Sequence, residues 1–286
     1  MFDRFVVVDW SANSTPKLGR DSIWIADRHH AGAVTLTNLA TRAAAEAFLV
    51  DLFESDSTSS TLVGVDFSLG YPNGTAAALG LTGTPWSTMW ALLAESIVDD
   101  ERNANNRFAV AAALNRRLTG GAAPFWGCPP TQVSSTLAST KSCPPSSLAE
   151  WRTVEAQLRA RGRRPFSGWQ LLGAGAVGSQ SLLGIPMIVR LCERLGERVH
   201  VWPFTTGFAV PALDDGAIVV AEVWPSMLTI DTDGTVRDAA QVATTVSWLA
   251  DADRDGRLDA LLSPALSSAV SAVAVDEEGW VLGVVP

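Results

Sequence analysis

The chain opens with an apolar run that ends in an acidic residue. Residues 4–10 read RFVVVDW, and such an uninterrupted, β-branched run predicts a strand that is buried on both faces. Residues 22–26 and 34–39 have the patterns of two further strands, and the segment 28–32 between them is typical of a hairpin turn. Together, the three runs predict an antiparallel meander.

The next two elements predict how this meander continues. Residues 41–53 carry apolar side chains at helical spacing, and Thr41 is a residue type that favours the N-cap position. Residues 61–67, TLVGVDF, then repeat the pattern of the first strand. The order strand, strand, strand, helix, strand is the start of a ribonuclease-H-like fold, in which a right-handed crossover places the fourth strand beside the first and parallel to it.

The amino-acid composition of the chain changes after this fourth strand. Between residues 72 and 168, turns rich in Gly, Pro, Ala and Ser surround helical pieces such as 107–118, which predicts a helical or irregular insertion. Beyond the insertion, the pattern predicts a helix at 182–195, strands at 199–204 and 217–224, a closing helix from about Arg257 and a last strand in the terminal GWVLGVV. We therefore expect a single α/β domain over residues 1–286, with a ribonuclease-H-like mixed sheet of three antiparallel strands plus parallel strands, flanked by helices.

Three carboxylates stand at the ends of apolar strands. Asp9, Asp66 and Glu222 occur in the contexts VVVDW, VGVDF and VAEVW. Open α/β sheets bind ligands at the C-terminal ends of their parallel strands, and a buried ionised carboxylate needs a partner, a metal or a proton. Mg²⁺ or Mn²⁺ prefers such oxygen ligands and can hold both reacting oxygens of a phosphodiester. The alternative is that one or more of these acids accept backbone hydrogen bonds in turns.

A fourth acid is available in the segment 251–262, DADRDGRLDALL. Asp255 and Asp259 are one helical turn apart and could face the sheet edge together. Equally, Asp255 could be an N-cap and Asp259 a first-turn anion that the helix dipole stabilises. Pro264 would kink the closing helix and alter the direction of Asp259.

The net charge limits which partners the chain can bind. A formal charge of −9 opposes non-specific adsorption to nucleic acid or anionic lipid, so binding to DNA or RNA would need a local basic patch. Two arginine runs could form such a patch or a solvated face: Arg102, Arg107, Arg116 and Arg117, and Arg159, Arg161, Arg163 and Arg164. Because no stretch is apolar enough for a membrane span and no signal peptide opens the chain, we expect a cytoplasmic protein without a membrane partner.

Other motifs indicate weaker alternatives. The segment 173–178, GAGAVG, matches the glycine fingerprint of dinucleotide-binding loops, with Glu193 near the spacing of its acidic residue, but no clear strand precedes it. A loop that leads into a helix is the other interpretation. Cys128, Cys143 and Cys192 lie far apart, which favours reduced thiols over disulfides or zinc ligands.

Seven short motifs that span most of the chain carry a resemblance to a known family. They are VVVDWSA (6–12), VGVDFSLGYP (63–72), NRFAVAAALNR (106–116), PFWGCP (124–129), VGSQSLLGIP (177–186), AEVWPS (221–226) and RLDALL (257–262). These motifs resemble the bacterial family of predicted ribonuclease-H-fold nucleases known as domain of unknown function 429. The resemblance implies the same fold, and it places the acidic positions of that family on Asp9, Asp66, Glu222 and Asp259.

Two functions follow from these patterns. The first is a metal-dependent nuclease or phosphodiesterase, in which the four acids are the catalytic and metal-binding residues and Mg²⁺ or Mn²⁺ is the cofactor. The alternative is a protein that binds a small molecule or nucleotide in the same cleft without turnover, with Trp10, Trp126 and Trp224 as walls. Some members of the family that these motifs resemble carry labels for cobalamin or molybdopterin biosynthesis, and the second function allows such a link.

Overall fold

A mixed β-sheet forms the centre of the computed structural model, which describes residues 2–141, 147–173, 176–211, 214–230, 232 and 234–285. Within these residues the sheet has six strands in the order β3-β2-β1-β4-β6-β5. Their bounds are β1 Arg4–Asp9, β2 Ile23–His29, β3 Thr35–Leu39, β4 Thr61–Val65, β5 Val199–Val201 and β6 Ile218–Glu222. β1, β2 and β3 pair antiparallel, whereas β4, β6 and β5 continue parallel to β1. This topology confirms the predicted ribonuclease-H-like sheet.

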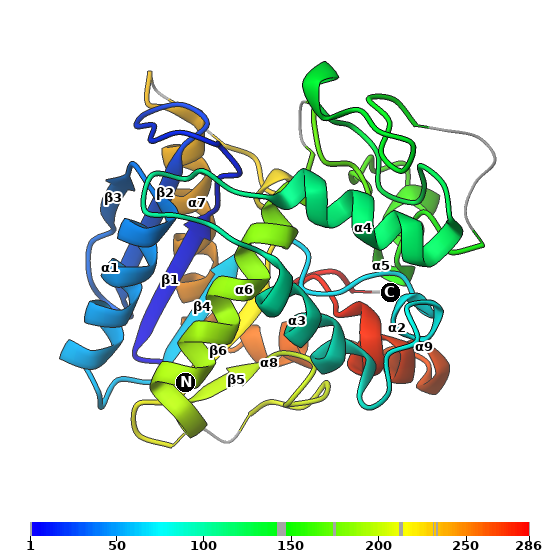
Figure 1. The fold of residues 1–286 in the computed structure, drawn as a ribbon. Coiled ribbons are helices and arrows are strands. Elements are labelled where there is room, and N and C mark those ends of the chain that lie inside the picture. Colours follow the sequence, from blue (N-terminus) through cyan, green and yellow to red (C-terminus); the bar gives the residue numbers. More distant parts are fainter. Residues whose placement is uncertain are drawn as a thin grey trace.

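Helices cover both faces of the sheet (Figure 1). Their bounds are α1 Arg42–Ser55, α2 Thr75–Ala78, α3 Pro85–Ser96, α4 Arg107–Thr119, α5 Thr153–Ala160, α6 Gly178–Leu195, α7 Arg237–Arg254, α8 Leu258–Leu262 and α9 Ser268–Val273. α1 and α6 lie on one face, and α7 lies behind β1 and β2 on the other. α1 begins as predicted, because the Thr41 hydroxyl accepts a hydrogen bond from the amide of Ala44 at 3.2 Å.

The alternation of side chains along each strand divides the core into two clusters. In β1, Val6 and Val8 pack in the cluster that includes residues of α1 and α6, whereas Phe5 and Val7 pack in the cluster that includes residues of α7. Successive strand residues point to opposite faces, so a strand covered on both sides must be apolar throughout. This requirement explains the uninterrupted run that opens the chain.

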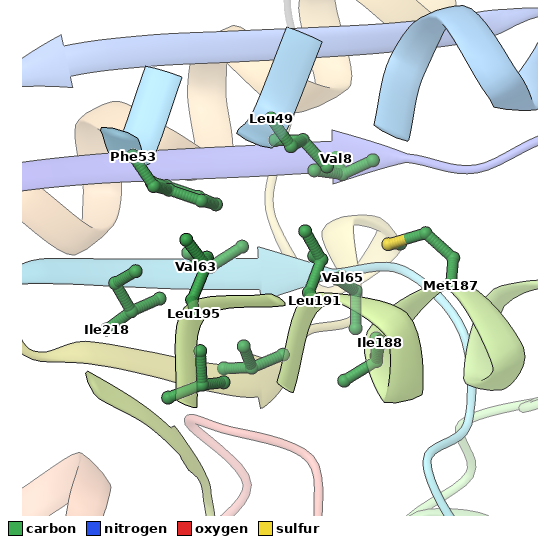
Figure 2. A pocket seen from close by; sticks show the side chains of 12 residues that line it. Val8, Leu49, Phe53, Val63, Val65, Met187, Ile188, Leu191, Leu195 and Ile218 are labelled. Carbon is green, nitrogen blue, oxygen red and sulfur yellow. The ribbon is translucent and has the colours of Figure 1, made fainter. Parts of the chain in front are cut away.

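A small gap remains between β4 and the helices on its α6 face. Figure 2 shows this gap, whose walls are aliphatic and aromatic side chains such as Leu49, Val65, Met187 and Leu191. Its volume is about 10 Å³ and no polar atom lines it. A water molecule needs about this volume and also two or more polar partners. The gap is therefore a packing defect of the core and not a binding site.

The C-terminal part of the fold differs from the predicted one. The sequence patterns did not indicate α7, since β-branched residues obscure its apolar positions Val242, Val246 and Leu249. The expected closing helix is only the five-residue α8, and Pro264 lies after its end and kinks no helix. The terminal GWVLGVV is not a strand beyond one bridge between Val281 and Glu222, because Gly279 and Gly283 adopt positive φ angles of 70° and 89°.

The elements between β4 and α6 contact the end of the chain. α2, α3, α4 and α5 all fall in the segment 72–168, for which an insertion was predicted. The Glu277 carboxylate accepts hydrogen bonds from the amides of Gly74 (2.6 Å) and Ala76 (2.7 Å), and the Glu278 carboxylate accepts them from Asn73 (2.9 Å) and Thr153 (2.6 Å). These contacts fix the starts of α2 and α5 to the C-terminal π-helical segment Ala274–Glu278.

No helix in the described part of the chain has the length and apolar character to cross a membrane.

The close contact between α6 and the segment after β4 generates a stability prediction. A Cβ atom at Gly184 would lie 2.3 Å from Cζ of the buried Phe67 ring. We expect Gly184→Ala to lower the free energy of unfolding by about 1–3 kcal/mol, because overpacking outweighs the better helix propensity of alanine. Urea-induced unfolding measures the difference. Gly168→Ala is the matched control, since no atom lies within 4 Å of its added Cβ; equal losses in the two variants would contradict the packing.

Candidate functional site

Two of the predicted acids lie side by side at the C-terminal ends of neighbouring parallel strands. The register of β1 and β4 pairs Val8 with Val65, so Asp9 and Asp66 are the next residues on the two strands. The charge of Asp66 acts on Asp9, so the two carboxyl groups are close neighbours at this edge of the sheet. Two neighbouring carboxylates repel each other, so the pair favours one protonated acid in the absence of a cation.

The second acid of this pair is held in place by α6 and by the chain after β1. The amide of Trp10 donates a hydrogen bond to Oδ1 of Asp66 at 2.8 Å, and Nε2 of Gln180 donates to Oδ2 at 3.2 Å. The same Gln180 nitrogen donates to the Trp10 carbonyl. Each Asp66 oxygen keeps a further lone pair, so these contacts orient the carboxylate and leave it able to bind another group.

Burial raises the pKa values of both acids. The pKa of Asp9 lies well above its ordinary value, first because of burial and then because of the charges of Asp66, Asp238 and Asp21. Burial also raises the pKa of Asp66 to about 6, although the hydrogen bonds from Trp10 and Gln180 work against that rise. A bound cation would remove this penalty, since an opposite charge favours the ionised form of each acid.

Glu222 lies at the same sheet edge but is already paired. It ends β6, next to Val65 of β4, and Arg152 binds both of its carboxylate oxygens, with Nη1 to Oε2 at 2.8 Å and Nη2 to Oε1 at 2.6 Å. The amide of Leu69 donates to Oε2 as well, at 3.2 Å. Burial raises the pKa of Glu222, and Arg152 offsets part of that rise. Glu222 is therefore satisfied by the protein itself.

Asp259 does not join the other acids. It is exposed on α8, and α8 follows α7, whose residue Asp253 accepts a hydrogen bond from the amide of Phe2 at 2.9 Å. Because Phe2 precedes β1, the end of α7 lies near the beginning of that strand, whereas Asp9 lies at its far end. The structure therefore places Asp259 away from the site.

Asp238 is the acid that the sequence patterns missed. It lies in the first turn of α7, near the end of β1, where its charge contributes to the raised pKa of Asp9. Its Oδ2 accepts a hydrogen bond from the amide of Asp21 at 2.6 Å. The apolar spacing of Val242, Val246 and Leu249 was the available signal for this helix, and an acid in the first turn is typical of a helix N-terminus.

The paired acids open onto a large cleft. Its volume is about 1250 Å³, and Asp9, Asp66, Glu222 and Asp238 are among the residues that line it. Basic side chains also line it: Lys17, Arg20, Arg107 and Arg237. From the two predicted arginine runs, only Arg107 belongs to this lining in the described residues. Trp10 and Trp224 line the cleft, whereas Trp126 does not.

The donor set fits a magnesium-type site in part. Among the described residues, no group of three or more histidine, cysteine or acidic side chains is arranged to hold a metal ion. Mg²⁺, however, is usually held by one or two carboxylates, with waters and substrate phosphates as the other ligands. The neighbouring pair Asp9 and Asp66 fits that requirement. Glu222 does not, because Arg152 binds both of its oxygens.

The glycine motif and the cysteines have structural surroundings. Gly173 and Gly178 are described, whereas residues 174 and 175 lie outside the described ones. Among the described residues no strand ends at this motif, which leads into α6. Gly178 packs so closely that an added Cβ would lie 2.4 Å from the Gly168 carbonyl oxygen. Glu193 lies within α6 itself, so the βαβ setting of a dinucleotide site is missing. Cys128 and Cys192 are free thiols, and Cys143 lies outside the described residues.

Comparisons with known proteins do not identify a function for this site. The chain matches no family model, and no curated protein or solved structure matches it. The geometry of the cleft and the sequence motifs are therefore the basis for a function.

The raised pKa values of the acid pair generate a prediction about pH. The folded pair binds protons more tightly than the same acids in the unfolded chain, since the pKa of Asp66 rises from 3.8 to about 6 on folding. The contribution of the pair to the stability of the metal-free protein should therefore fall as the pH rises from about 4 to above 6. Asp9→Asn removes one charge of the pair, so we expect this variant to be more stable than the natural protein at pH 7, by about 1–3 kcal/mol.

Urea-induced unfolding at pH 4 and pH 7 in the presence of a chelator measures this effect. Asp259→Asn is the control, because its carboxylate is exposed and does not line the cleft, and it should follow the natural protein at both pH values. An Asp9→Asn variant that is less stable at pH 7 would show that the two acids do not repel.

The buried ion pair of Arg152 generates a second prediction. Arg152→Met leaves Glu222 and Glu155 buried without their cation. We expect the free energy of unfolding at pH 7 to fall by about 3–5 kcal/mol, with partial recovery when Glu222→Gln is added. Denaturant unfolding provides the values, and Arg163→Met, at an exposed position, should change them by less than about 0.5 kcal/mol. Identical transitions for the two arginine variants would rule out this role.

Proposed function

We propose that this protein hydrolyses phosphodiester bonds with Mg²⁺ or Mn²⁺ as its cofactor, as a nuclease or a related phosphodiesterase. The observation that carries the proposal is the pair Asp9 and Asp66, which lies at the C-terminal edge of neighbouring parallel strands and opens onto a large cleft. Keeping two like charges in contact costs stability. A site that retains such a pair is typical of cation binding, since a divalent ion replaces the proton and removes the repulsion.

Each residue near the pair has a separate role in this proposal. Asp9 and Asp66 would hold the metal, and a metal bound there would activate a water molecule and stabilise the charge on the phosphoryl oxygens. Gln180 and the Trp10 amide orient Asp66. Asp238 adds negative charge near Asp9, which favours a cation. Glu222 acts by fixing the buried Arg152 at the end of β6.

The sequence motifs agree with this proposal. The resemblance to the family of predicted ribonuclease-H-fold nucleases rests on motifs that include both members of the acid pair. The basic side chains in the lining of the cleft favour an anionic substrate, although the overall charge of −9 disfavours non-specific contact with nucleic acid. A substrate that enters the cleft itself would meet the basic groups locally.

A binding function without turnover is the second candidate. Trp10 and Trp224 both line the cleft, and aromatic walls favour a planar ligand such as a nucleotide base. Under this alternative, nucleotides, cobalamins or pterins would raise the melting temperature without metal.

Hydrolysis assays test the leading proposal. DNA, RNA, branched DNA and a chromogenic phosphodiester are incubated with Mg²⁺ or Mn²⁺. Asp9→Asn should lower the rate by about 100-fold or more, because it removes a direct metal ligand, and loss of even an outer partner of a ligand costs about 10–100-fold. Asp259→Asn should retain the full rate, since this carboxylate does not line the cleft. Full activity in Asp9→Asn, or no metal-dependent hydrolysis of any substrate, would overturn the proposal, and ligand stabilisation without metal would then favour the binding function.

A further inference from the structure

Arg107 is a buried cation in the wall of the large cleft onto which the acid pair opens. It is the first residue of α4, its exposed fraction is only 6%, and it lines the cleft. Its Nε donates to the hydroxyl oxygen of Ser179 at 3.0 Å, and its Nη1 donates to Ser14 Oγ at 3.0 Å and to Asn105 Oδ1 at 2.7 Å. All three partners are neutral.

No carboxylate within the described residues forms an ion pair with Arg107. The neighbouring cation Arg42 is paired with both oxygens of Asp99, at 2.6 Å from Nη2 and 2.5 Å from Nε, so that acid is already neutralised. The second terminal nitrogen of Arg107, Nη2, makes no hydrogen bond to any described residue, although it carries two N–H donors. Burial, together with the charge of Arg42, lowers the pKa of Arg107 to about 10. A buried cation without an ion-pair partner costs free energy unless an anionic ligand supplies the counter-charge.

We infer that Arg107 anchors a phosphoryl group of the ligand that binds in this cleft. The guanidinium presents a planar set of donors that matches two phosphate oxygens, and an anion supplies the counter-charge that the protein withholds. The hydroxyl of Ser14, which is exposed, can turn to donate a further hydrogen bond. Val177 and Ser179 at the start of α6 line the same cleft, so the positive end of the helix dipole adds to the attraction.

Two consecutive residues of α6 connect this anchor to the acid pair. Ser179 accepts the hydrogen bond from Arg107, and Gln180 donates to Asp66. The anchor is therefore next to the proposed metal position and separate from it. A substrate with two phosphoryl groups, such as a nucleic acid strand, could place one at the acid pair and the neighbouring one at Arg107. The anchor thus deepens the proposed function, and its part in turnover rests on that function.

Binding of inorganic phosphate to the metal-free, full-length protein tests the anchor without any turnover. Melting temperatures are measured over a series of phosphate concentrations, with sodium chloride at matched ionic strength, and yield a dissociation constant. We expect Arg107→Gln to weaken phosphate binding about tenfold or more, and Arg107→Lys to weaken it less, since lysine keeps the charge but loses the planar donor set. Arg116→Gln, at an exposed position on the same helix, is the matched control and should bind as the natural protein does.

Equal phosphate binding by Arg107→Gln and Arg116→Gln would overturn the anchor, as would the absence of phosphate binding to the natural protein. If Arg107→Gln does not fold, Arg107→Lys decides the question, because unchanged binding in that variant contradicts a planar contact. The result is independent of the hydrolysis assay. Arg107-dependent phosphate binding without metal-dependent hydrolysis would retain the anchor and reject the phosphodiesterase, and the reverse combination would reject the anchor alone.

Discussion

The ion pair between Arg152 and Glu222 connects the sheet to the elements outside it. Arg152 binds the last residue of β6 through two hydrogen bonds, Glu155 of α5 through the same guanidinium, and the Glu278 carbonyl near the C-terminus at 2.8 Å. Three distant parts of the chain therefore meet at one cation. Its burial is tolerable because its donors meet carboxylates or a carbonyl, which is the condition under which a buried charge does not unfold its surroundings.

This ion pair also determines the charge of the sheet edge. Three parallel strands end there, and each ends in or is followed by an acid, so three adjacent negative charges would result if all were free. Arg152 neutralises Glu222, which leaves Asp9 and Asp66 as the pair without a cation. The raised pKa values of Asp9 and Asp66 are an electrostatic cost of the edge, to which the burial of Glu222 adds. The protein thus satisfies one acid permanently and leaves the other two available to a ligand.

The N-terminal half of the fold could be predicted from the sequence, and the position of the fourth acid could not. Because β1 and β4 are buried on both faces, RFVVVDW and TLVGVDF are uninterrupted apolar runs that predict strands. The crossover rule then placed Asp9 beside Asp66. The sequence signal for α7 was weaker, because Thr and Val favour strands in isolation, whereas tertiary packing makes them helical here. Without α7 in the prediction, Asp259 was the acid expected to complete the site, and Asp238 was not assigned to any helix or strand. The partner of Glu222 was equally hidden, since Arg152 is seventy positions away and no local pattern announces such a contact.

Two buried arginines near the cleft show how differently the same side chain can be used. Arg152 contacts two carboxylates, and the charges of these acids raise its pKa in spite of burial. Arg107 donates hydrogen bonds to three neutral groups and lies over the Phe108 ring, and burial lowers its pKa. A guanidinium that only supports the fold gains most from acidic partners supplied by the chain, as Arg152 does. A guanidinium that recognises an anion must be kept without one, because a permanent carboxylate would occupy the donors that the ligand needs. The contrast between the two therefore assigns Arg152 to the scaffold and Arg107 to the ligand.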